Sequence, residues 1–422
     1  MNAPANIPGG PAAPCITLAS GRRIGHGCPC FVVAEVGNNH QGDMATARSM
    51  VREAARAGAD AVKFQKRDTS ALLTTEGAQA AYGGPNSFGA TYGEHRDALE
   101  LSAAQFAELK QLAESLGMVF FASAWDAPSL AVLADLKVEL LKVCSADVVN
   151  VPMLRRVAAL GLPVVLSTGM STLAQVDRAV AELSAGRGGV VVLHCNSSYP
   201  CDEADIALPV VDQLAQRYGL PVGYSGHERG IGPSVAAVAR GACLVERHFT
   251  LDRAQRGTDH QASLEPDDLA LMVRMIREVE RAMTVTEKRV TPHEAAMAVK
   301  LRKSLVAARD LAAGTVLAPD DLTVKSPGDG LSPELWDAVI GNSLTVDLPR
   351  DGQLLPAMLA MPVQTGEPEE QDDPDGVEDR NSAAPKATAG SVPDAAAGSA
   401  PESPSASLSV SVPEIPRKAG AA

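Results

Sequence analysis

Two histidines follow consecutive apolar segments and could bind one metal ion. His227 lies in "GYSGHERG" (223–230), and His248 lies in "LVERHFT" (244–250). If these segments are neighbouring strands, the imidazoles lie close together, and neutral imidazoles suit Mn, Fe, Co, Ni or Zn. Two ligands are too few for a closed structural zinc site, so water or substrate would take the open positions. The alternative is a pair of unrelated histidines satisfied by ordinary hydrogen bonds.

Three carboxylates are candidates for the same site. Glu246 precedes His248 by two residues, and residues i and i+2 of a strand point to the same face. Glu246 is therefore either a metal ligand or a group that orients one. Glu35 ends the first apolar segment, "FVVAEV". Asp259 follows the last such segment, where an aspartate is more often a cap or turn residue.

Two lysines and several hydroxyl groups indicate a site for a phosphorylated anion. Lys63 and Lys142 lie inside apolar segments, where an unpaired charge is costly. Lysine binds phosphate as a point charge, and hydroxyls supply further hydrogen bonds. Either lysine alone could simply be solvated or paired in a salt bridge, but that reading is weaker for both together. The hydroxyl-bearing residues at the ends of the segments are Ser145, Ser167, Ser197, Tyr199 and Ser225.

These residues would be positioned by eight repeats of one unit, an apolar segment followed by a helical pattern. The segments begin at residues 31, 61, 118, 140, 163, 190, 221 and 244. A Gly- and Ser-containing insertion separates the second segment from its helix at 102–116. Alternating buried strands and helices predict an α/β protein, and eight units in about 250 residues fit a (β/α)8 TIM barrel. A doubly wound open sheet is the alternative, but the chain has no Gly-rich dinucleotide motif.

The remaining sequence predicts a second, smaller domain. We expect a flexible N-terminus at 1–20, the barrel at 21–283, a linker at 284–302 and a small β-rich domain at 303–362. Residues 363–422 are rich in Pro, Ala, Ser, Asp and Glu, and this composition predicts disorder.

The composition excludes several classes of protein. The 422 residues carry a formal net charge of −14, which argues against nucleic-acid binding. No apolar stretch approaches the ~20 residues of a membrane span, and no signal peptide is evident. The seven cysteines lack a disulfide or zinc pattern, so free thiols in a reducing cytoplasm are expected.

The order of these motifs resembles the N-acetylneuraminate (sialic acid) synthase family over roughly residues 20–361. The matching stretches include "AEVGNNHQGD", "LKVCSAD", "LHCNSSYP", "GYSGHERG", "VERHFT" and "DHQASLEP". "KSLVAARDLAAGTVLAPDDLTVKSPGDG" resembles the C-terminal antifreeze-like (SAF) domain of that family. "TYGEHR" and "SGHE" are similar to the animal-type synthases.

The resemblance implies condensation of phosphoenolpyruvate with an open-chain N-acylmannosamine-type sugar, assisted by Mn²⁺ or Mg²⁺, with release of phosphate. It implies His227 and His248 as metal ligands and Glu35, Glu246, Lys63 and Lys142 as catalytic residues. Phosphoenolpyruvate would be held by Lys63, Lys142, Ser145, Ser167, Ser197 and Ser225. The sugar would contact Glu35, Tyr199 and Asp259. A domain-swapped homodimer is also implied, in which each small domain caps the partner's barrel.

Three positions depart from the pattern of many bacterial members. Ser197 replaces an Asn, and Gly226 replaces an Asp before the first metal histidine. Ser326 replaces an Arg that reaches the partner's site, with Lys325 as a candidate substitute. Related alternatives are a 9-phosphate synthase that uses the 6-phosphorylated sugar, or a legionaminic or pseudaminic acid synthase. Alternatives of other classes are a catalytically inactive carbohydrate-binding protein and a metal-dependent barrel hydrolase.

Overall fold

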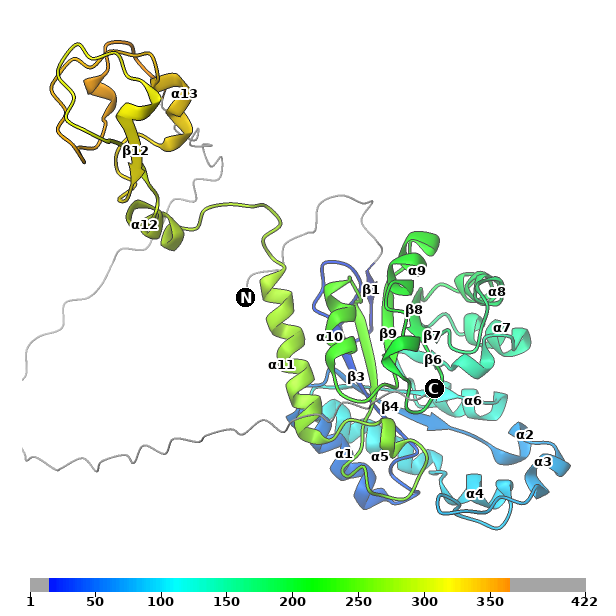
Figure 1. Cartoon of the computed structure of the whole chain (residues 1–422). Helices are drawn as coiled ribbons and strands as arrows, with labels where there is room; N and C mark the ends of the chain where they lie inside the picture. The colour runs from blue at the N-terminus through cyan, green and yellow to red at the C-terminus, as the bar shows by residue number, and fades with distance from the viewer. Residues whose placement is uncertain (1–14, 365–422) are drawn as a thin grey trace, which may run out of the picture. The chain divides into compact units, whose positions relative to one another are not determined.

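A computed structural model describes residues 15–364 (Figure 1). The chain divides into two compact units, Met1–Arg289 and Val290–Ala422, which are described separately below. The predicted disordered segment 363–422 lies outside the described residues, apart from its first two positions.

The first unit is a closed barrel of eight strands, as the repeated apolar segments predict. Each strand pairs in parallel with its neighbours, in the order β10-β3-β4-β5-β6-β7-β8-β9, so the last strand closes onto the first. The doubly wound alternative is therefore wrong, because an open sheet has two unpaired edges. The strands are β3 (Phe31–Gly37), β4 (Ala61–Lys66), β5 (Val119–Ala124), β6 (Leu141–Val143), β7 (Val164–Ser167), β8 (Val190–Cys195), β9 (Val222–Gly226) and β10 (Leu244–His248).

Helices surround the barrel, and their ends follow local capping signals (Figure 1). Asp43 caps the first of them, and Ser102 with Gln105 forms a reciprocal capping box at α5. Within residues 15–364, none of the helices combines the length and apolar composition that a membrane span requires. The barrel helices are α1 (Met44–Arg56), α5 (Ala103–Ser115), α6 (Ala127–Asp135), α7 (Val151–Ala159), α8 (Leu173–Ser184), α9 (Val210–Tyr218), α10 (Gly232–Ala239) and α11 (Pro266–Ala282).

The predicted insertion after the second strand forms three short helices before α5. These are α2 (Thr69–Leu72), α3 (Thr75–Gln79) and α4 (Tyr92–Ala98). Aromatic side chains hold the insertion together, with the ring centroids of Tyr82 and His95 4.5 Å apart. The insertion leaves the carboxyl end of β4, so it belongs to the end of the barrel that carries the active site in this fold.

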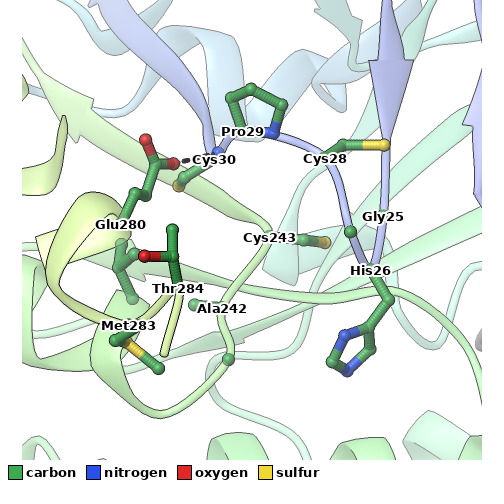
Figure 2. A pocket seen from close by; sticks show the side chains of 13 residues that line it. Gly25, His26, Cys28, Pro29, Cys30, Ala242, Cys243, Glu280, Met283 and Thr284 are labelled. Atoms are coloured by element: carbon green, nitrogen blue, oxygen red, sulfur yellow. Dashed lines mark hydrogen bonds between the residues drawn. The ribbon is translucent and has the colours of Figure 1, made fainter. Parts of the chain in front are cut away.

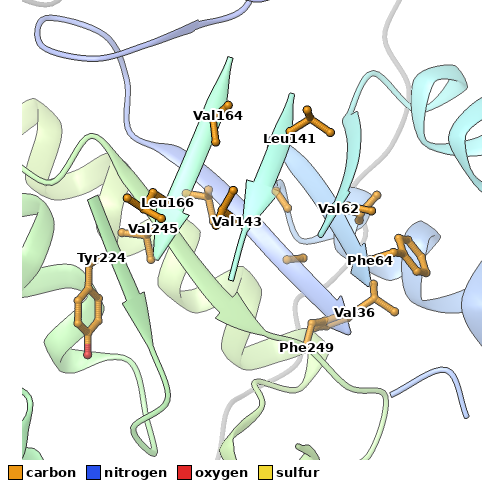
Figure 3. Packing of buried hydrophobic residues seen from close by; sticks show 14 of the residues in the cluster. Val36, Val62, Phe64, Leu141, Val143, Val164, Leu166, Tyr224, Val245 and Phe249 are labelled. Carbon is orange, nitrogen blue, oxygen red and sulfur yellow. The ribbon is translucent and has the colours of Figure 1, made fainter. Parts of the chain in front are cut away.

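Alternate residues along each strand enter two different apolar layers. In β3, Val32 and Val36 pack outward with the helices, whereas Phe31 and Val33 point into the barrel. Figure 3 shows the outward layer, in which Val62, Leu141 and Leu166 project from their strands. The inward layer fills the amino-terminal part of the barrel. This period of two decides which polar side chains face the barrel axis further along each strand.

Residues 15–24 form a short hairpin, although the sequence predicted a flexible segment as far as residue 20. β1 (Ile16–Thr17) pairs antiparallel with β2 (Arg23–Ile24). Ile16, Leu18 and Ile24 are buried and join the inward apolar layer. Burying these side chains against the amino-terminal ends of the strands stabilises the hairpin, and the Pro- and Ala-rich composition of the preceding residues gives no sign of it.

The second unit is small and has its own apolar core. β11 (Ser304–Ala307) pairs antiparallel with β12 (Leu322–Lys325), and α13 spans Trp336–Val339. Leu305, Leu317 and Leu354 are among the residues that form the core. Within the segment predicted as a linker, Pro292–Leu301 forms helix α12, and the Gly328 amide donates to the Val299 carbonyl. The helix therefore packs with the small unit.

Candidate active site

The polar residues at the carboxyl ends of the barrel strands continue the inward-facing rows of the apolar layer. Phe31 and Val33 are followed on the same face by Glu35, and Leu244 is followed by Glu246 and then His248. A cavity of about 220 Å³ opens at this end of the barrel. Its lining includes Glu35, Lys63, Lys142, Ser145, Ser167, Ser197, Tyr199, Ser225, His227, Glu246 and His248. Eleven of the twelve predicted site residues thus line one cavity.

Four charged side chains form one buried network in this cavity. Lys63 Nζ lies 3.1 Å from Glu35 Oε1 and 3.3 Å from Glu246 Oε1. Lys142 Nζ lies 3.3 Å from the same Glu246 oxygen, so that oxygen bridges both ammonium groups. Strand pairing explains this arrangement, because Glu35 pairs in register with Lys63 across β3 and β4. Two positive and two negative charges balance here without a ligand.

The two carboxylates have opposite protonation tendencies. Burial raises the pKa of Glu35 above its usual value, and this effect exceeds that of the Lys63 ammonium. Burial also opposes ionisation of Glu246, but Lys142 and Lys63 lower its pKa to about 2. The pKa of Lys63 is raised, because the Glu246 and Glu35 carboxylates outweigh its burial. Glu246 is therefore a fixed negative charge, whereas Glu35 is the carboxylate that more readily holds a proton.

Four serine hydroxyls surround the charged network, and three of them make only weak hydrogen bonds or none within residues 15–364. Ser167 Oγ is buried and has no hydrogen-bond partner among the described residues. Ser145 Oγ accepts a bond from the Gly169 amide at 3.0 Å and donates a weak bond to Cys195 sulfur at 3.7 Å, which an oxyanion would replace. Ser197 has only a distant contact with Cys195 sulfur, at 4.0 Å. Ser225 instead donates to Glu246 at 3.3 Å. Such donors beside two ammonium groups are suited to an oxyanion.

The two imidazoles lie side by side, with ring centroids 5.3 Å apart. His227 Nδ1 lies 2.6 Å from the Asn196 carbonyl, so this nitrogen carries a proton and Nε2 faces away from that bond. Nδ1 of His248 is buried, and no group in the described part of the chain forms a hydrogen bond with it. Burial lowers the pKa of His248 to about 3, so its ring is neutral at physiological pH. These features fit a divalent cation, because a neutral imidazole with an unused nitrogen is a good ligand.

Two features of the site determine how a cation would bind there, the number of protein ligands and competition with a proton. Within residues 15–364, no group of three or more His, Cys, Asp or Glu side chains is arranged to hold a metal ion. A cation bound by two imidazoles would therefore need oxygen ligands from water or substrate. Although burial opposes it, contacts with Cys195 and Asn196 raise the pKa of His227. A cation at His227 would compete with a proton, so its binding should strengthen as the pH rises.

Tyr199 and Asp259 lie beside the imidazoles at the outer part of the site. The Tyr199 ring centroid is 4.0 Å from that of His227, and the residue is 46% exposed. Asp259 Oδ2 lies 4.0 Å from His248 Nδ1, but Asp259 does not line the cavity. Asp259 is thus the one of the twelve predicted residues that does not line the cavity, and its carboxylate faces His248.

Six lining residues were missing from the sequence prediction, among them Gln65, Trp125 and Cys195. Gln65 donates to Glu35 at 2.8 Å. It lies two residues after Lys63, so the strand period alone could have identified it. Trp125 follows β5, and its buried indole nitrogen has no hydrogen-bond partner between residues 15 and 364. Cys195 ends β8 and contacts Ser145 at 3.7 Å. No spacing rule singles out the last two residues.

Gly226 is explained by a buried ion pair outside the barrel axis. Arg247 Nη1 donates to Glu228 at 2.8 Å, and both side chains are fully buried. Tyr224 and Ser234 hydroxyls also donate to Glu228. A Cβ atom at position 226 would overlap Glu228 and Tyr224. An aspartate at this position therefore does not fit this arrangement.

Comparison with known proteins agrees with this architecture. Residues 50–288 match the NeuB family, and residues 302–360 match the SAF domain. The human N-acetylneuraminate-9-phosphate synthase is 41% identical, over 81% of this chain and 95% of its own length. The N,N'-diacetyllegionaminic acid synthase of Legionella pneumophila is 37% identical, over 80% of this chain and 98% of its own length.

A solved structure of a sialic acid synthetase is also similar to this chain. The N-acetylneuraminic acid (sialic acid) synthetase of Leptospira borgpetersenii, in complex with citrate, has a TM-score of 0.60 and 33% identity. The match covers 68% of this chain and 95% of that chain. The chain belongs to the NeuB family and carries a C-terminal SAF domain. It is thus an enzyme of the sialic acid synthase type, a family whose reaction condenses phosphoenolpyruvate with a sugar.

Proposed function

We propose that this chain condenses phosphoenolpyruvate with the open-chain form of an N-acylmannosamine-type sugar, producing a nonulosonic acid and inorganic phosphate. The observation that carries the proposal is the network in which one Glu246 oxygen contacts both Lys63 and Lys142, directly beside the two imidazoles. The cavity thus combines two lysines that bind an anion with two imidazoles that would hold a cation able to polarise a carbonyl. A catalytically inactive carbohydrate-binding protein would have no need to bury two lysines at this position.

Phosphoenolpyruvate would bind at the lysines and the serine hydroxyls. Its phosphate and carboxylate oxygens would accept bonds from Lys63, Lys142 and the unpartnered Ser167 hydroxyl. Ser145, Ser197 and Ser225 would complete the donor set. Both ammonium groups already contact carboxylates, so an incoming anion shares them with Glu246 and Glu35 rather than meeting free charges.

The carboxylates support the developing charge of the reaction. When carbon C3 of phosphoenolpyruvate attacks the aldehyde, carbon C2 becomes oxocarbenium-like, water adds there, and phosphate leaves by C–O cleavage. A negative charge fixed at Glu246 stabilises that centre electrostatically. Glu35, whose pKa is raised by burial, is suited to exchanging a proton with the added water or with the new hydroxyl group.

A divalent metal, Mn²⁺ or Mg²⁺, would be held by His227 and His248. When bound, it would act as a Lewis acid on the aldehyde oxygen of the sugar. Tyr199, at the mouth of the site, would contact the sugar together with Glu35. Asp259 would orient His248 and reach the sugar from the edge of the site.

The proposal extends to the phosphorylation state of the sugar, the assembly of the protein and the role of the small domain. The sugar is either free or 6-phosphorylated, and both kinds of synthase resemble this chain, as do legionaminic acid synthases. We also propose a cytoplasmic homodimer, with the small domain contributing to sugar binding. Lys325 remains the candidate substitute for the arginine missing at Ser326, although its ammonium group pairs with Asp351 within the small domain.

A phosphate-release screen tests the proposal. The full chain would be incubated with phosphoenolpyruvate and a panel of N-acylated hexosamines, free and 6-phosphorylated, with and without Mn²⁺. We expect metal-dependent phosphate release with at least one mannosamine-type sugar, and loss of release with chelator. Phosphate release that needs no sugar would indicate a phosphatase. No release with any sugar, from a chain that still binds phosphoenolpyruvate, would favour the inactive carbohydrate-binding protein.

A further inference from the structure

Four of the seven cysteines gather at the end of the barrel opposite the active site. Cys30 directly precedes β3 and Cys243 directly precedes β10, so both lie at the amino-terminal ends of the strands. Cys15 and Cys28 flank the β1–β2 hairpin that covers this end. The synthase chemistry proposed above uses none of them, and all seven cysteines are free thiols.

Cys15 and Cys28 form the close pair within this group. Their sulfur atoms lie 3.2 Å apart, and both residues are partly exposed. The guanidinium Nε of Arg23 donates to Cys15 sulfur, also at 3.2 Å. A guanidinium at this position stabilises negative charge on the Cys15 sulfur, and a thiolate is the form that attacks a disulfide.

A cavity of about 140 Å³ opens beside Cys28, one member of this pair (Figure 2). Cys28, Cys30 and Cys243 line it together with His26 and Glu280. Figure 2 shows the sulfur atoms of Cys28 and Cys30 pointing to opposite sides of Pro29. The Cys28 sulfur lies 3.2 Å from that of Cys15, so Cys28 faces Cys15 and not its neighbour in sequence. Cys30 and Cys243 are buried, so a reagent reaches them less easily.

We propose that Cys15 and Cys28 are a thiol-modification site that reacts with low-molecular-weight disulfides of the glutathione class and closes to an intramolecular disulfide. In the first step the Cys15 thiolate attacks R–S–S–R, forming Cys15–S–S–R and releasing R–S⁻. In the second step Cys28 sulfur attacks the Cys15 sulfur, the Cys28 proton passes to the departing R–S⁻, and R–SH leaves. Two protein thiols are oxidised, and one R–S–S–R is reduced to two thiols.

The surroundings assign the attacking and resolving roles. The Arg23 guanidinium donates a hydrogen bond to the Cys15 sulfur, whereas burial raises the pKa of Cys28 to about 11. Burial likewise raises the pKa of Cys243 to about 12 and that of Cys30 well above its usual range. Cys15 is thus the residue expected to react first, and Cys28 is the thiol within reach of its mixed disulfide.

Closure would stabilise the amino-terminal end of the barrel without altering the site. The bond would close a loop across the whole β1–β2 hairpin, whose Ile16 and Ile24 pack into the barrel interior. A loop of this length constrains the unfolded chain, and we expect a melting temperature raised by about 5 °C. Because the active site lies at the other end of the strands, the phosphate-release rate should change less than about 2-fold.

Peptide mapping of the full chain in oxidised glutathione tests the proposal. Trypsin separates Cys15, in residues 1–22, from Cys28 and Cys30, in residues 24–48. After alkylation of free thiols, we expect these two peptides to be cross-linked in the wild type and released by reductant. C28S should accumulate glutathione on Cys15 instead of the cross-link, and C15S should form neither. R23Q should slow the first step about 10-fold.

Two controls separate this pair from its neighbours. C30S and C243S should keep the cross-link, and C28S should lose the rise in melting temperature. Absence of the cross-link in the wild type at saturating oxidised glutathione would overturn the proposal. So would a cross-link that persists in C28S, since it would then run through Cys30. Neither result depends on which sugar the enzyme uses, so this test stands apart from the phosphate-release screen.

Discussion

Replacing Glu246 by glutamine tests the charged network at the centre of the site. The change keeps the shape of the side chain and removes its charge. In the wild type, one Glu246 oxygen lies 3.3 Å from Lys63, from Lys142 and from the Ser225 hydroxyl. In E246Q the two buried ammonium groups share Glu35 as the remaining carboxylate of the network. We expect the variant to be less stable and almost inactive.

The magnitude follows from the charges. Each ion pair at 3.3 Å is worth about 5 kcal/mol at an effective dielectric constant of about 20, before the cost of burying the carboxylate. The net effect is reflected in the pKa of Glu246, which falls from 4.5 to about 2. That difference corresponds to about 3 kcal/mol of folding free energy. It predicts a melting temperature about 8 °C lower for E246Q.

The direction of the pKa shift of Glu246 determines how its contribution to folding stability changes with pH. The folded state has the lower pKa, so the contribution of Glu246 is complete above about pH 4.5 and is lost as the pH falls toward 2. Chemical denaturation of E246Q and wild type should therefore differ most near neutral pH, and the curves should converge in acid. Inorganic phosphate should restore more stability to E246Q than to wild type, because the anion pairs with the freed ammonium groups.

The matched control is E278Q, which removes a carboxylate exposed on α11 and 4.0 Å from Arg274. Exposed pairs of this kind contribute little, so E278Q should stay within about 0.5 kcal/mol of wild type. Steady-state phosphate release should fall at least about 100-fold in E246Q and remain unchanged in E278Q. If E246Q unfolded at the same denaturant concentration as E278Q, the carboxylate would not bridge the lysines as described.

Three further changes probe other parts of the barrel. H248A should lower Mn²⁺ affinity and phosphate release together, as measured by titration calorimetry and turnover, whereas H293A on α12 should change neither; full activity of H248A in chelator would exclude the metal role. R247M should lower the free energy of unfolding by about 3–5 kcal/mol, because it leaves the Glu228 carboxylate buried without its cation. Burial lowers the pKa of His40 to about 4, so the neutral ring is favoured in the folded state and stability falls as the pH drops below about 6.5. Between pH 7 and 5 this loss should be about 2 kcal/mol in denaturation experiments and absent in H40Q; an unchanged slope in H40Q would contradict it.

The sequence predicted the barrel well because its signal is repeated eight times. Buried parallel strands are apolar on both faces, and each is followed by a helix whose period differs from that of a strand. The ends of the strands could likewise be located, and with them eleven residues that line one cavity. The hairpin at residues 15–24 was missed because two-residue strands give almost no periodic pattern.

The partners of the site residues could not be predicted in the same way. Nothing in the sequence indicates that Lys63 contacts Glu35 and Glu246 at once, because the three residues come from β4, β3 and β10. The contact exists because the last strand pairs with the first, which brings Glu246 next to residues more than 180 positions earlier. The Glu228–Arg247 pair that fills the space beside Gly226 is hidden from the sequence for the same reason.

By itself the sequence determined which residues sit at the ends of which strands, since local hydrophobic pattern and turn composition fix that. Only the closed barrel decided which of these side chains face the axis, how far apart their charges lie and which are shielded from water. Those quantities set the protonation of Glu35 and Glu246 and the neutrality of His248. They depend on distance and burial, and both arise from contacts between segments that are remote along the chain.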